Sequence, residues 1–482
     1  MKQERGEHFL PGRLAWGLLV ILSAAGARAD ILMTPYLQAA TKNSIQVVVE
    51  CNSTASATVE YGLTSSYGNT AITEKYENTT GGTYAQSIRL TGLQANTVYH
   101  YHVKQGASTS ADATFRTAPL PGTPFRFAWL ADNRGNQSQY DAILNHIKAA
   151  NPSLILHGGD IASDGSYANI KSEFFTPTAL SIYSQIPFVL TIGNHEQWTQ
   201  DPMAFVEAPI SASNTQDYYS LDYGDMHLLV MLLYTGENTY YDLGPTSAQY
   251  AFAQSDLSST RQQWKIVIAH KTPYAASDPN GGGHPEATEL FPITQGVYQP
   301  NKVDAWIGGH NHYYQHNIVN GIHYVIIGSC AAELYVPTTA SYTVKSAQTY
   351  CYGIIDVSPT DFNIAVYDGN GSVIDNVNLH KSPASIVPQP ADLPGSDYRL
   401  EQNYPNPFNP STEIHYTLKD DGYVRLEVMD VLGRVVGVPV SGRQLAGAHS
   451  IAFSGQNLPS GVYLYRLQTA NFSQTKRMVL LR

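Results

Sequence analysis

Five short polar blocks between residues 132 and 312 constrain the fold of this chain more than any other feature. Four of them follow a run of apolar residues, such as Leu154-Ile155-Leu156 or Ile266-Val267-Ile268. Because the carboxyl ends of strands in an open α/β sheet converge on one crevice, we expect the side chains of these blocks to meet there. They offer carboxylate, amide and imidazole groups, which suit two adjacent divalent cations of hard to borderline character. The candidate metal ligands are Asp132, Asp160, Asn194, His270, His310 and His312.

The length and charge of the chain bound its class. With 482 residues it is too long for one hydrophobic core and is expected to form about three domains. The formal net charge is −11 and the sequence has no basic tract, which argues against nucleic acid as a standing partner. A small phosphorylated substrate is still compatible with this charge, because bound metal ions reverse its local sign.

The N-terminus predicts a secretory signal peptide over residues 1–29. Lys2, Arg5 and Arg13 precede an apolar run over residues 14–25, and small residues follow that run at a suitable cleavage site. A membrane anchor is the alternative, but this run is well short of the ~20 apolar residues that a spanning helix needs. We therefore expect an exported protein.

Changes of pattern divide the rest of the chain into four segments. Short alternating strands with turn signals predict a β-sandwich over residues 30–119. Strands that alternate with helices, such as the amphipathic stretch 139–150, predict an α/β layered domain over residues 122–380. A stretch rich in Pro, Ser and Asp predicts a linker over residues 381–398, and an all-β, Ig-like domain is expected over residues 399–482.

The three cysteines leave two interpretations open. Either Cys330 and Cys351 form a disulfide in the exported protein, with Cys51 alone, or all three are buried thiols. Geometry decides between these interpretations, and sequence spacing does not supply it. The sequence has no C-x-x-C spacing, which argues against a cysteine-ligated zinc site.

The set of candidate ligands suits phosphoester hydrolysis. Two cations about 3.5–4 Å apart generate a hydroxide nucleophile and neutralise the phosphoryl oxygens, and a shared carboxylate must hold them that close. Asp160, on a Gly-Gly-Asp turn after an apolar run, is the candidate bridge. Each block taken singly is weak, because a lone aspartate after a strand more often forms a turn or a helix cap. Five blocks in one order favour a dinuclear metal hydrolase over that alternative.

The series D…GD…GNHE…H…GHNH resembles the calcineurin-like metallophosphoesterases. The segment from Leu93 to Tyr99 resembles a corner of fibronectin type III modules, and such a module ahead of the series resembles the purple acid phosphatase branch. The resemblance covers roughly residues 33–379 and implies a four-layer α/β/β/α sandwich with two divalent or trivalent metal ions, of iron, zinc or manganese. It implies that one metal site is Asp132, Asp160 and His312, and that the other is Asp160, Asn194, His270 and His310.

Two positions depart from the family pattern. Metallophosphoesterases of the general type have His where this chain has Arg134, and purple acid phosphatases have Tyr where it has Ser163. The first metal site therefore lacks one protein ligand, and without that tyrosine the protein is not expected to be purple. Arg134 either binds a substrate phosphate through its planar guanidinium or faces solvent or a loop carboxylate, and we favour the phosphate role.

Further side chains are implied to lie around the metal ions. His195 follows the candidate ligand Asn194 and would orient the substrate or protonate the leaving group. His284 lies in a loop where purple acid phosphatases carry an outer histidine at a somewhat shorter spacing. Glu196 either hydrogen-bonds a ligand imidazole or caps the following segment.

The segment from Leu400 to Pro410 contains three prolines and forms neither a helix nor a central strand. Together with Met429–Arg434 and Leu458–Tyr463 it resembles the C-terminal sorting domain of type IX secretion cargo. This resemblance implies the secretion machinery as a partner, and a secreted or cell-surface location. An Ig-like accessory module that helps to bind polysaccharide is the alternative.

The sequence as a whole predicts a secreted, dinuclear, acid phosphatase-like enzyme that hydrolyses phosphomonoesters with a metal-activated hydroxide. A phosphodiesterase or nucleotide hydrolase of the same fold is the alternative, because substrate choice lies in loops such as residues 234–250 and 275–288. A non-catalytic cell-surface binding protein with a degenerate metal site is a further hypothesis, favoured by Arg134 and opposed by the six candidate ligands. The expected partners are a small phosphoester and the secretion machinery.

Overall fold

The computed structural model describes residues 30–196, 204–206, 218–236, 239–382, 398–403, 406–444, 446–456 and 458–481. The predicted signal peptide, most of the predicted linker and Tyr404-Pro405 of the proline-rich segment lie outside these residues. Among the described residues, no helix is both long and apolar enough to cross a membrane.

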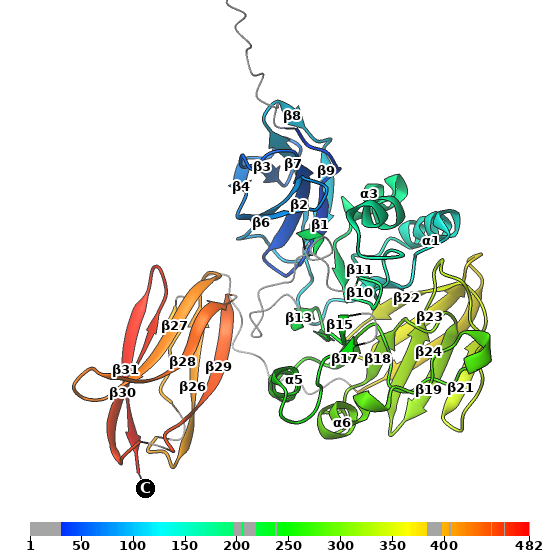
Figure 1. Ribbon diagram of the computed structural model, residues 1–482. Helices are drawn as coiled ribbons and strands as arrows, with labels where there is room; N and C mark the ends of the chain where they lie inside the picture. The colour runs from blue at the N-terminus through cyan, green and yellow to red at the C-terminus, as the bar shows by residue number, and fades with distance from the viewer. Residues whose placement is uncertain are drawn as a thin grey trace, which may run out of the picture.

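The chain begins with a β-rich region of two sheets that pack face to face (Figure 1). Residues such as Val47, Ile88 and Tyr101 alternate inward and form its core. One sheet contains β1 (Tyr36–Gln38), β2 (Ile45–Cys51), β5 (Lys75–Asn78) and β6 (Tyr84–Leu90). The other contains β3 (Thr58–Gly62), β4 (Asn69–Ile72), β7 (Val98–Gln105), β8 (Ser108–Thr109) and β9 (Ala113–Arg116).

The first of these sheets does not stop at the boundary that the sequence suggested near residue 119. Strand β1 pairs in parallel with β12 (Phe188–Leu190) through Gln38 and Phe188. The result is one ten-stranded sheet in the order β24-β23-β22-β10-β11-β12-β1-β2-β6-β5. The N-terminal region is therefore continuous in hydrogen bonding with the sheet that carries part of the candidate site.

Two sheets form the middle of the central region. The first continues through β10 (Phe125–Leu130), β11 (Leu154–His157), β12, β22 (Cys351–Val357), β23 (Asp361–Asp368) and β24 (Val373–His380). The second has seven strands in the order β13-β14-β17-β18-β20-β19-β21. Their bounds are β13 (Tyr219–Tyr223), β14 (Met226–Val230), β17 (Trp264–Ile268), β18 (Ala305–Gly308), β19 (Tyr314–Val319), β20 (Ile322–Ile327) and β21 (Thr343–Ala347).

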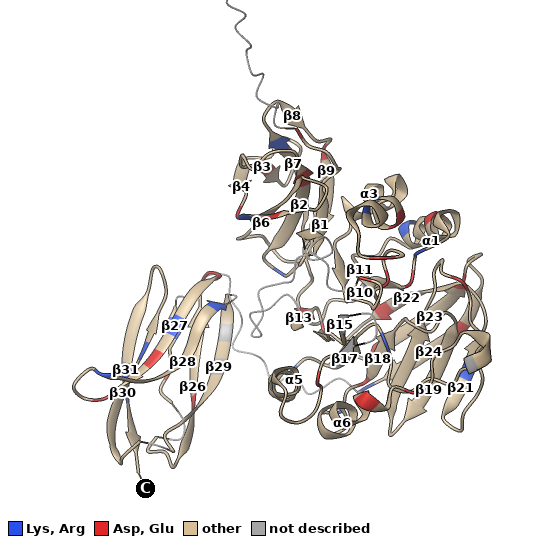
Figure 2. Cartoon of the chain, viewed as in Figure 1, with Lys and Arg blue, Asp and Glu red and all other residues tan. Residues whose placement is uncertain are grey.

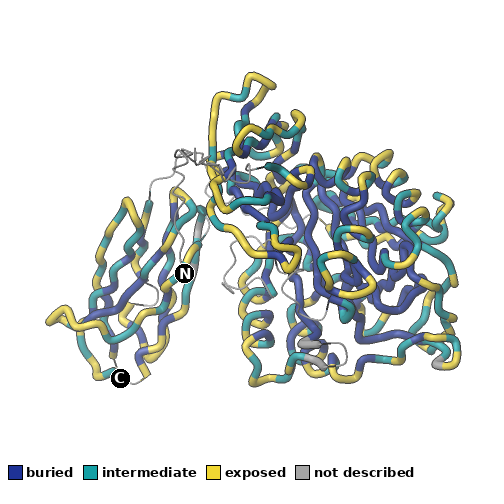
Figure 3. The backbone as a smooth tube through the Cα atoms, turned by 45° about the horizontal axis from the view of Figure 1, so that its top comes forward, coloured by how far each residue is buried: buried dark blue, intermediate teal, exposed yellow. Residues whose placement is uncertain are grey.

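Helices cover the outer face of each sheet, so that four layers result. On β10, Phe127 and Trp129 point into the core between the sheets, whereas Ala128 and Leu130 pack under the helices. Both faces of the strand are buried, which explains its unbroken apolar sequence. The outer layers contain α1 (Gln137–Ala150) and α3 (Pro177–Tyr183) on one side, and α5 (Ala248–Ser259) and α6 (Phe291–Ile293) on the other. Figure 3 shows the buried strands running between these exposed outer segments.

Helix α1 confirms the helix expected over residues 139–150. The side chain of Asn136 accepts a hydrogen bond from the backbone N–H of Gln139, which satisfies one of the free donors of the first turn. Asn151 adopts a left-handed conformation at the C-terminus, and Pro152 follows it. Tyr140, Ile143, Leu144 and Ile147 form the buried face.

The C-terminal region is all-β, as expected. Its core contains residues such as Ile414, Leu426 and Tyr465 from both of its sheets. One sheet has β25 (Arg399–Leu400), β26 (Ser411–Leu418) and β29 (Gly447–Ser454). The other has β27 (Gly422–Met429), β28 (Val435–Gln444), β30 (Gly461–Gln468) and β31 (Ser473–Leu480).

The three cysteines are buried free thiols, which is the second of the two sequence interpretations. The Cys351 thiol donates to the carbonyl oxygen of Gly328 at 3.2 Å. Burial raises the pKa of the Cys51 thiol to about 12, so its nucleophilic thiolate form is strongly disfavoured.

A buried carboxylate joins the N-terminal region to a loop beside the candidate site. Glu50 of β2 is fully buried and accepts a hydrogen bond from Thr83 at 2.6 Å. It also pairs with Tyr167 and Lys171, which lie on the segment that follows Asp160. Because a buried ion is costly without its partner, this contact holds the segment against β2.

We expect Glu50→Ala to lower the free energy of unfolding by about 3 kcal/mol, because it leaves the Lys171 ammonium without its buried partner. Urea denaturation followed by tryptophan fluorescence measures this change. Glu60→Ala is the matched control, since it removes a partly exposed ion pair with Lys104 in the same region. Equal urea midpoints for the two variants would contradict the role given to Glu50.

Candidate metal centre

Three predicted ligands adopt a backbone conformation that is rare outside glycine. Asp132, Asp160 and His310 have φ angles of 54°, 52° and 67°, and each lies two or three residues beyond the end of a strand. Left-handed backbone costs roughly 1–2 kcal/mol per residue for side chains other than glycine. Strain of this kind concentrates at functional sites, where it aims side chains that a relaxed turn would direct elsewhere.

Glycines let these ligand loops approach one another. A Cβ atom on Gly193 would lie 2.2 Å from Oδ1 of Asp160, and one on Gly309 would lie 2.3 Å from Oδ2 of Asp132. Any larger residue would therefore displace a predicted ligand. In the Gly-Asn-His and Gly-His motifs the glycine is therefore required for space, and the residues after it are predicted to bind metal.

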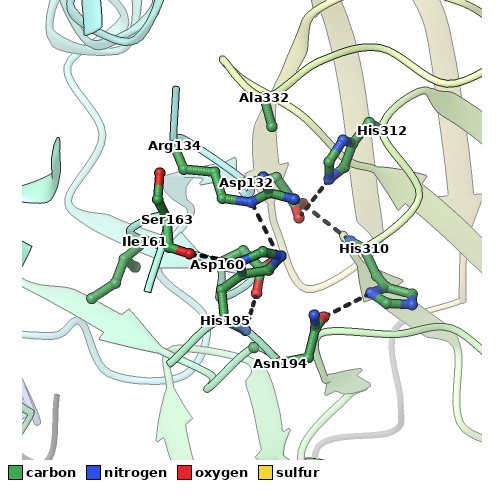
Figure 4. A network of polar contacts seen from close by, with 12 residues as sticks. Asp132, Arg134, Asp160, Ile161, Ser163, Asn194, His195, His310, His312 and Ala332 are labelled. Atoms are coloured by element: carbon green, nitrogen blue, oxygen red, sulfur yellow. Dashed lines mark hydrogen bonds and ion pairs between the residues drawn. The ribbon is translucent and has the colours of Figure 1, made fainter. Parts of the chain in front are cut away.

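Four predicted ligand atoms converge on one point, and we call them the His270 cluster: Nε2 of His270, Nδ1 of His310, Oδ1 of Asn194 and Oδ1 of Asp160. The His270 nitrogen lies 3.1 Å from the Asn194 oxygen, 3.2 Å from the His310 nitrogen and 3.4 Å from the Asp160 oxygen. The Asn194 oxygen lies 3.0 Å from the His310 nitrogen (Figure 4). Tetrahedral ligands about 2.0–2.1 Å from a metal are roughly 3.4 Å apart, so the cluster has the dimensions of a metal site.

Backbone carbonyls fix the tautomers of two histidines. Nδ1 of His270 donates to the carbonyl of Gly158 at 2.7 Å, and Nδ1 of His312 donates to the carbonyl of Glu333 at 2.6 Å. In each neutral ring Nε2 is left as the electron-pair donor, which is how outer partners orient metal-binding imidazoles. Burial disfavours the protonated form of His270, but the carboxylates of Asp160 and Asp132 outweigh it and raise its pKa to about 9. A cation would compete with that proton for Nε2.

The other half of the site centres on Asp132, which is fully buried. Its Oδ2 accepts the backbone N–H of His310 at 3.1 Å, but its Oδ1 has no hydrogen-bond partner among the described residues. That orphaned oxygen lies 3.5 Å from Nε2 of His312. An unpartnered buried carboxylate oxygen beside an imidazole fits a cation-binding position. Asp132, Asp160 and His270 are also grouped closely enough to share one ion.

The two oxygens of Asp160 face different surroundings. Oδ1 belongs to the His270 cluster and also accepts the backbone N–H of His195 at 3.0 Å. Oδ2 faces Nε of Arg134 at 3.6 Å and Nε2 of His195 at 3.8 Å. Arg134 therefore lies beside a predicted ligand and does not point away into solvent (Figure 4).

The hydroxyl of Ser163 is turned away from the predicted ligands. Both its Oγ and its backbone N–H donate to Oε2 of Glu173 at 2.9 Å. Its carbonyl accepts a hydrogen bond from Nδ1 of His195 at 2.8 Å, which leaves Nε2 of that ring facing the site. Ser163 thus positions His195 and supplies no hydroxyl of its own.

Among the described residues Glu196 binds backbone groups and not a ligand imidazole, while residues 197–203, which it was considered to cap, lie outside the described residues. Its buried carboxylate accepts the backbone N–H groups of Asp160, Ile161 and Gly193 at 3.0, 2.8 and 2.6 Å. It therefore fixes the turn that presents Asp160, although burial and the nearby Asp160 charge raise its pKa. The sequence motif placed Glu196 near the site but did not reveal these backbone partners.

Three aromatic rings also contact the predicted histidine ligands. His284, identified from the sequence, stacks on His310 with ring centroids 4.1 Å apart. Tyr335 stacks on His312 at 4.0 Å, and the hydroxyl of Tyr234 lies 3.5 Å from Nε2 of His310. Sequence reasoning placed Tyr234 only in a loop of interest and missed Tyr335, because no motif surrounds it.

Two family matches bear on this geometry. Residues 125–314 match the calcineurin-like phosphoesterases, and residues 402–481 match the secretion system C-terminal sorting domain. Purple acid phosphatase 23 of Arabidopsis thaliana is 25% identical over 270 residues, which are 47% of this chain and 56% of that protein. The probable inactive purple acid phosphatase 27 of the same plant is 24% identical over 338 residues, which are 58% of this chain and 54% of the relative. The chain thus spans about half the length of the curated relatives it matches.

Solved structures support the fold. The purple acid phosphatase PPD1 from yellow lupin seeds superposes with a TM-score of 0.62 and 19% identity, over 72% of this chain and 74% of its own. PhoD superposes with a TM-score of 0.52 and 13% identity, over 73% and 93%. The chain therefore contains a calcineurin-like phosphoesterase domain related to the purple acid phosphatases, followed by a C-terminal sorting domain of the type IX secretion system.

Proposed function

We propose that this protein is an exported, metal-dependent phosphoesterase that hydrolyses phosphomonoesters. The observation that carries the proposal is the His270 cluster, in which two imidazole nitrogens, an amide oxygen and a carboxylate oxygen lie within 3.0–3.4 Å of their neighbours. Together with Asp132 and His312, this donor set suits two ions of iron, zinc or manganese. Bound cations supply a hydroxide nucleophile at moderate pH and neutralise the phosphoryl oxygens.

The residues around the ions have distinct proposed roles. Asp160 is proposed to join the two halves, because its Oδ1 belongs to the His270 cluster and Asp132, Asp160 and His270 are grouped closely enough to share an ion. His195, held through Nδ1 by the Ser163 carbonyl, presents Nε2 to the substrate side, where its imidazolium form would give the Nε2 proton to the leaving alkoxide. His284 packs on His310 and keeps that ring in place.

Arg134 is proposed to bind a phosphate oxygen. Its Nε has no hydrogen-bond partner among the described residues, and about a fifth of its side chain is exposed (21%). A guanidinium so placed has donors left for an incoming anion, and its planar geometry suits a phosphate. Figure 2 shows Lys and Arg scattered among Asp and Glu along the ribbon.

Two alternative functions are compatible with the same fold. A phosphodiesterase of the same fold would use the same donor set and differ in the loops around it. A surface binding protein with a degenerate metal site is favoured by Arg134 and Ser163, and two of the matched plant relatives carry the name "probable inactive". The tests below separate these functions.

Purified protein loaded with zinc, manganese or iron is expected to contain bound metal and to hydrolyse p-nitrophenyl phosphate faster than bis(p-nitrophenyl) phosphate. Elemental analysis and release of p-nitrophenol measure the two properties, and chelator-treated protein is the control. Bound metal with a preference for the diester would favour the phosphodiesterase. Protein that binds no metal and hydrolyses neither ester would contradict the proposed enzymatic function.

Asp160→Asn is expected to lower both metal content and turnover, because it replaces the negative carboxylate proposed to bind both metal ions by a neutral amide. The loss should exceed the ~10–100-fold effect of removing an outer partner of a metal ligand. Asp164→Asn is the matched control, since Asp164 lies on the same loop and accepts only local hydrogen bonds. Full metal content in Asp160→Asn would reject the shared carboxylate.

Arg134→Ala is expected to raise KM for p-nitrophenyl phosphate by about tenfold. The variant loses one charge-assisted hydrogen bond to phosphate, which contributes ~1.5 kcal/mol to binding. Steady-state kinetics and elemental analysis are measured together. An unchanged KM with reduced metal content would show instead that Arg134 supports the Asp132 half of the site.

A further inference from the structure

Two loops beside the candidate site are joined to each other by their backbones. The N–H of Asp278 donates to the carbonyl of Val336, and the N–H of Val336 donates to the carbonyl of Gly281, both at 3.1 Å. Ser277 and Pro337 form a bridge at the same place. Residues 277–284 and 333–338 therefore form one unit, which we call the paired loops.

Each of the paired loops places one ring on a predicted metal ligand. His284 stacks on His310, and Tyr335 stacks on His312 with ring planes 14° apart. The backbone N–H of Tyr335 also donates to the carbonyl of His312 at 3.0 Å. The ring also lies close to Gly282, where a Cβ atom would lie 2.7 Å from Cδ1 of Tyr335. The tyrosine ring is thus fixed by its stack on His312, by its contact with Gly282 and through its backbone.

The phenol of Tyr335 has a cation beside it and a proton to donate. Burial raises the pKa of this phenol, and the positive charge of the neighbouring Arg134 guanidinium opposes that shift. A guanidinium only donates, so in a contact between the two groups the phenol oxygen is the acceptor and its own proton needs another partner. No acceptor for that proton appears among the residues that the structure describes. Its proton is therefore available to a ligand.

The residue at the family's tyrosine position offers no such donor. The hydroxyl of Ser163 is committed to Glu173, so it offers nothing to a ligand in the site. Arg134 and His195 both face Oδ2 of Asp160, at 3.6 and 3.8 Å, and Tyr335 adjoins Arg134. A guanidinium, an imidazole and a phenol therefore border the same edge of the site.

The chemistry of this edge distinguishes a monoester from a diester. A phosphomonoester presents three non-bridging oxygens and close to two negative charges, whereas a diester presents two such oxygens and one charge. The guanidinium, which is a fixed cation, and the phenol both donate, and the imidazole donates as well when it is protonated, so this edge matches the monoester group better. A diester would place its second organic substituent against one of these donors and leave it unpaired, which is costly in a partly buried site.

We propose that Tyr335 is a phosphate-binding residue whose hydroxyl donates to a phosphoryl oxygen while its oxygen accepts from Arg134, and that this pair selects phosphomonoesters over diesters. The inference rests on the proposed function and names its substrate class. Tyr335 would thus supply a tyrosine hydroxyl from the paired loops and not from the Ser163 position. Its role would be to donate a hydrogen bond to the substrate.

Tyr335→Phe in the full-length, metal-loaded protein tests the proposal. The phenyl ring preserves the stack on His312 and removes only the hydroxyl. Calorimetric titration with inorganic phosphate should show about tenfold weaker binding, as expected for one hydrogen bond. KM for p-nitrophenyl phosphate should rise more than kcat falls, and the monoester-to-diester ratio of kcat/KM should drop, with metal content unchanged. Tyr67→Phe is the control, because it loses a phenol hydrogen bond to Asp112 in the N-terminal β-rich region. Its phosphate affinity and its kinetic constants should equal those of the wild type.

Unchanged phosphate affinity and an unchanged monoester-to-diester ratio in Tyr335→Phe would overturn the proposal. A loss of bound metal would also overturn it, because Tyr335 would then support the ligands. The phosphate titration needs no turnover. If the wild-type protein hydrolyses neither ester and Tyr335→Phe still binds phosphate more weakly than the wild type, the Tyr335 contact is supported and the proposed enzymatic function is rejected.

Discussion

The position of the Asp160 carboxylate is the constraint on which the rest of the site depends. Its left-handed backbone follows the buried strand β11, and its turn is fixed by three backbone hydrogen bonds to Glu196. Gly193 packs so close that a Cβ atom there would collide with the carboxylate. A single strained residue is thus held by the buried Glu196 carboxyl and a glycine, with its Oδ1 in the His270 cluster and its Oδ2 facing Arg134 and His195.

The two halves of the proposed metal site are unequal. The His270 cluster has four donors at metal-like spacing, and the backbone carbonyl of Gly158 sets the tautomer of His270. The Asp132 half offers an orphaned carboxylate oxygen and His312, with Arg134 beside it in place of a further ligand. Because the guanidinium is a permanent cation, it lowers the electrostatic need for a second ion and supplies a donor for an anionic substrate. The asymmetry seen in the sequence therefore has a structural counterpart.

Much of the fold could be predicted from sequence because its signals are local. Apolar runs such as Phe127 to Leu130 require burial on both faces, and the polar residue after each run marks a strand end. The continuity of the sheet through Gln38 and Phe188 could not be predicted, because it depends on a pairing between segments 150 residues apart in the chain. Tyr335 was missed for a similar reason, since only the folded loops bring its ring onto His312. Glu196 was found, but the backbone groups that it binds are visible only in three dimensions.

Diffraction from metal-loaded crystals, with anomalous signal recorded at the absorption edge of the metal, tests the central claim most directly. The account predicts one strong peak about 2.0–2.2 Å from Nε2 of His270, Nδ1 of His310, Oδ1 of Asn194 and Oδ1 of Asp160. A weaker peak is expected between Asp132 and His312. Crystals that show no peak within the His270 cluster after loading with zinc, manganese or iron would contradict the account.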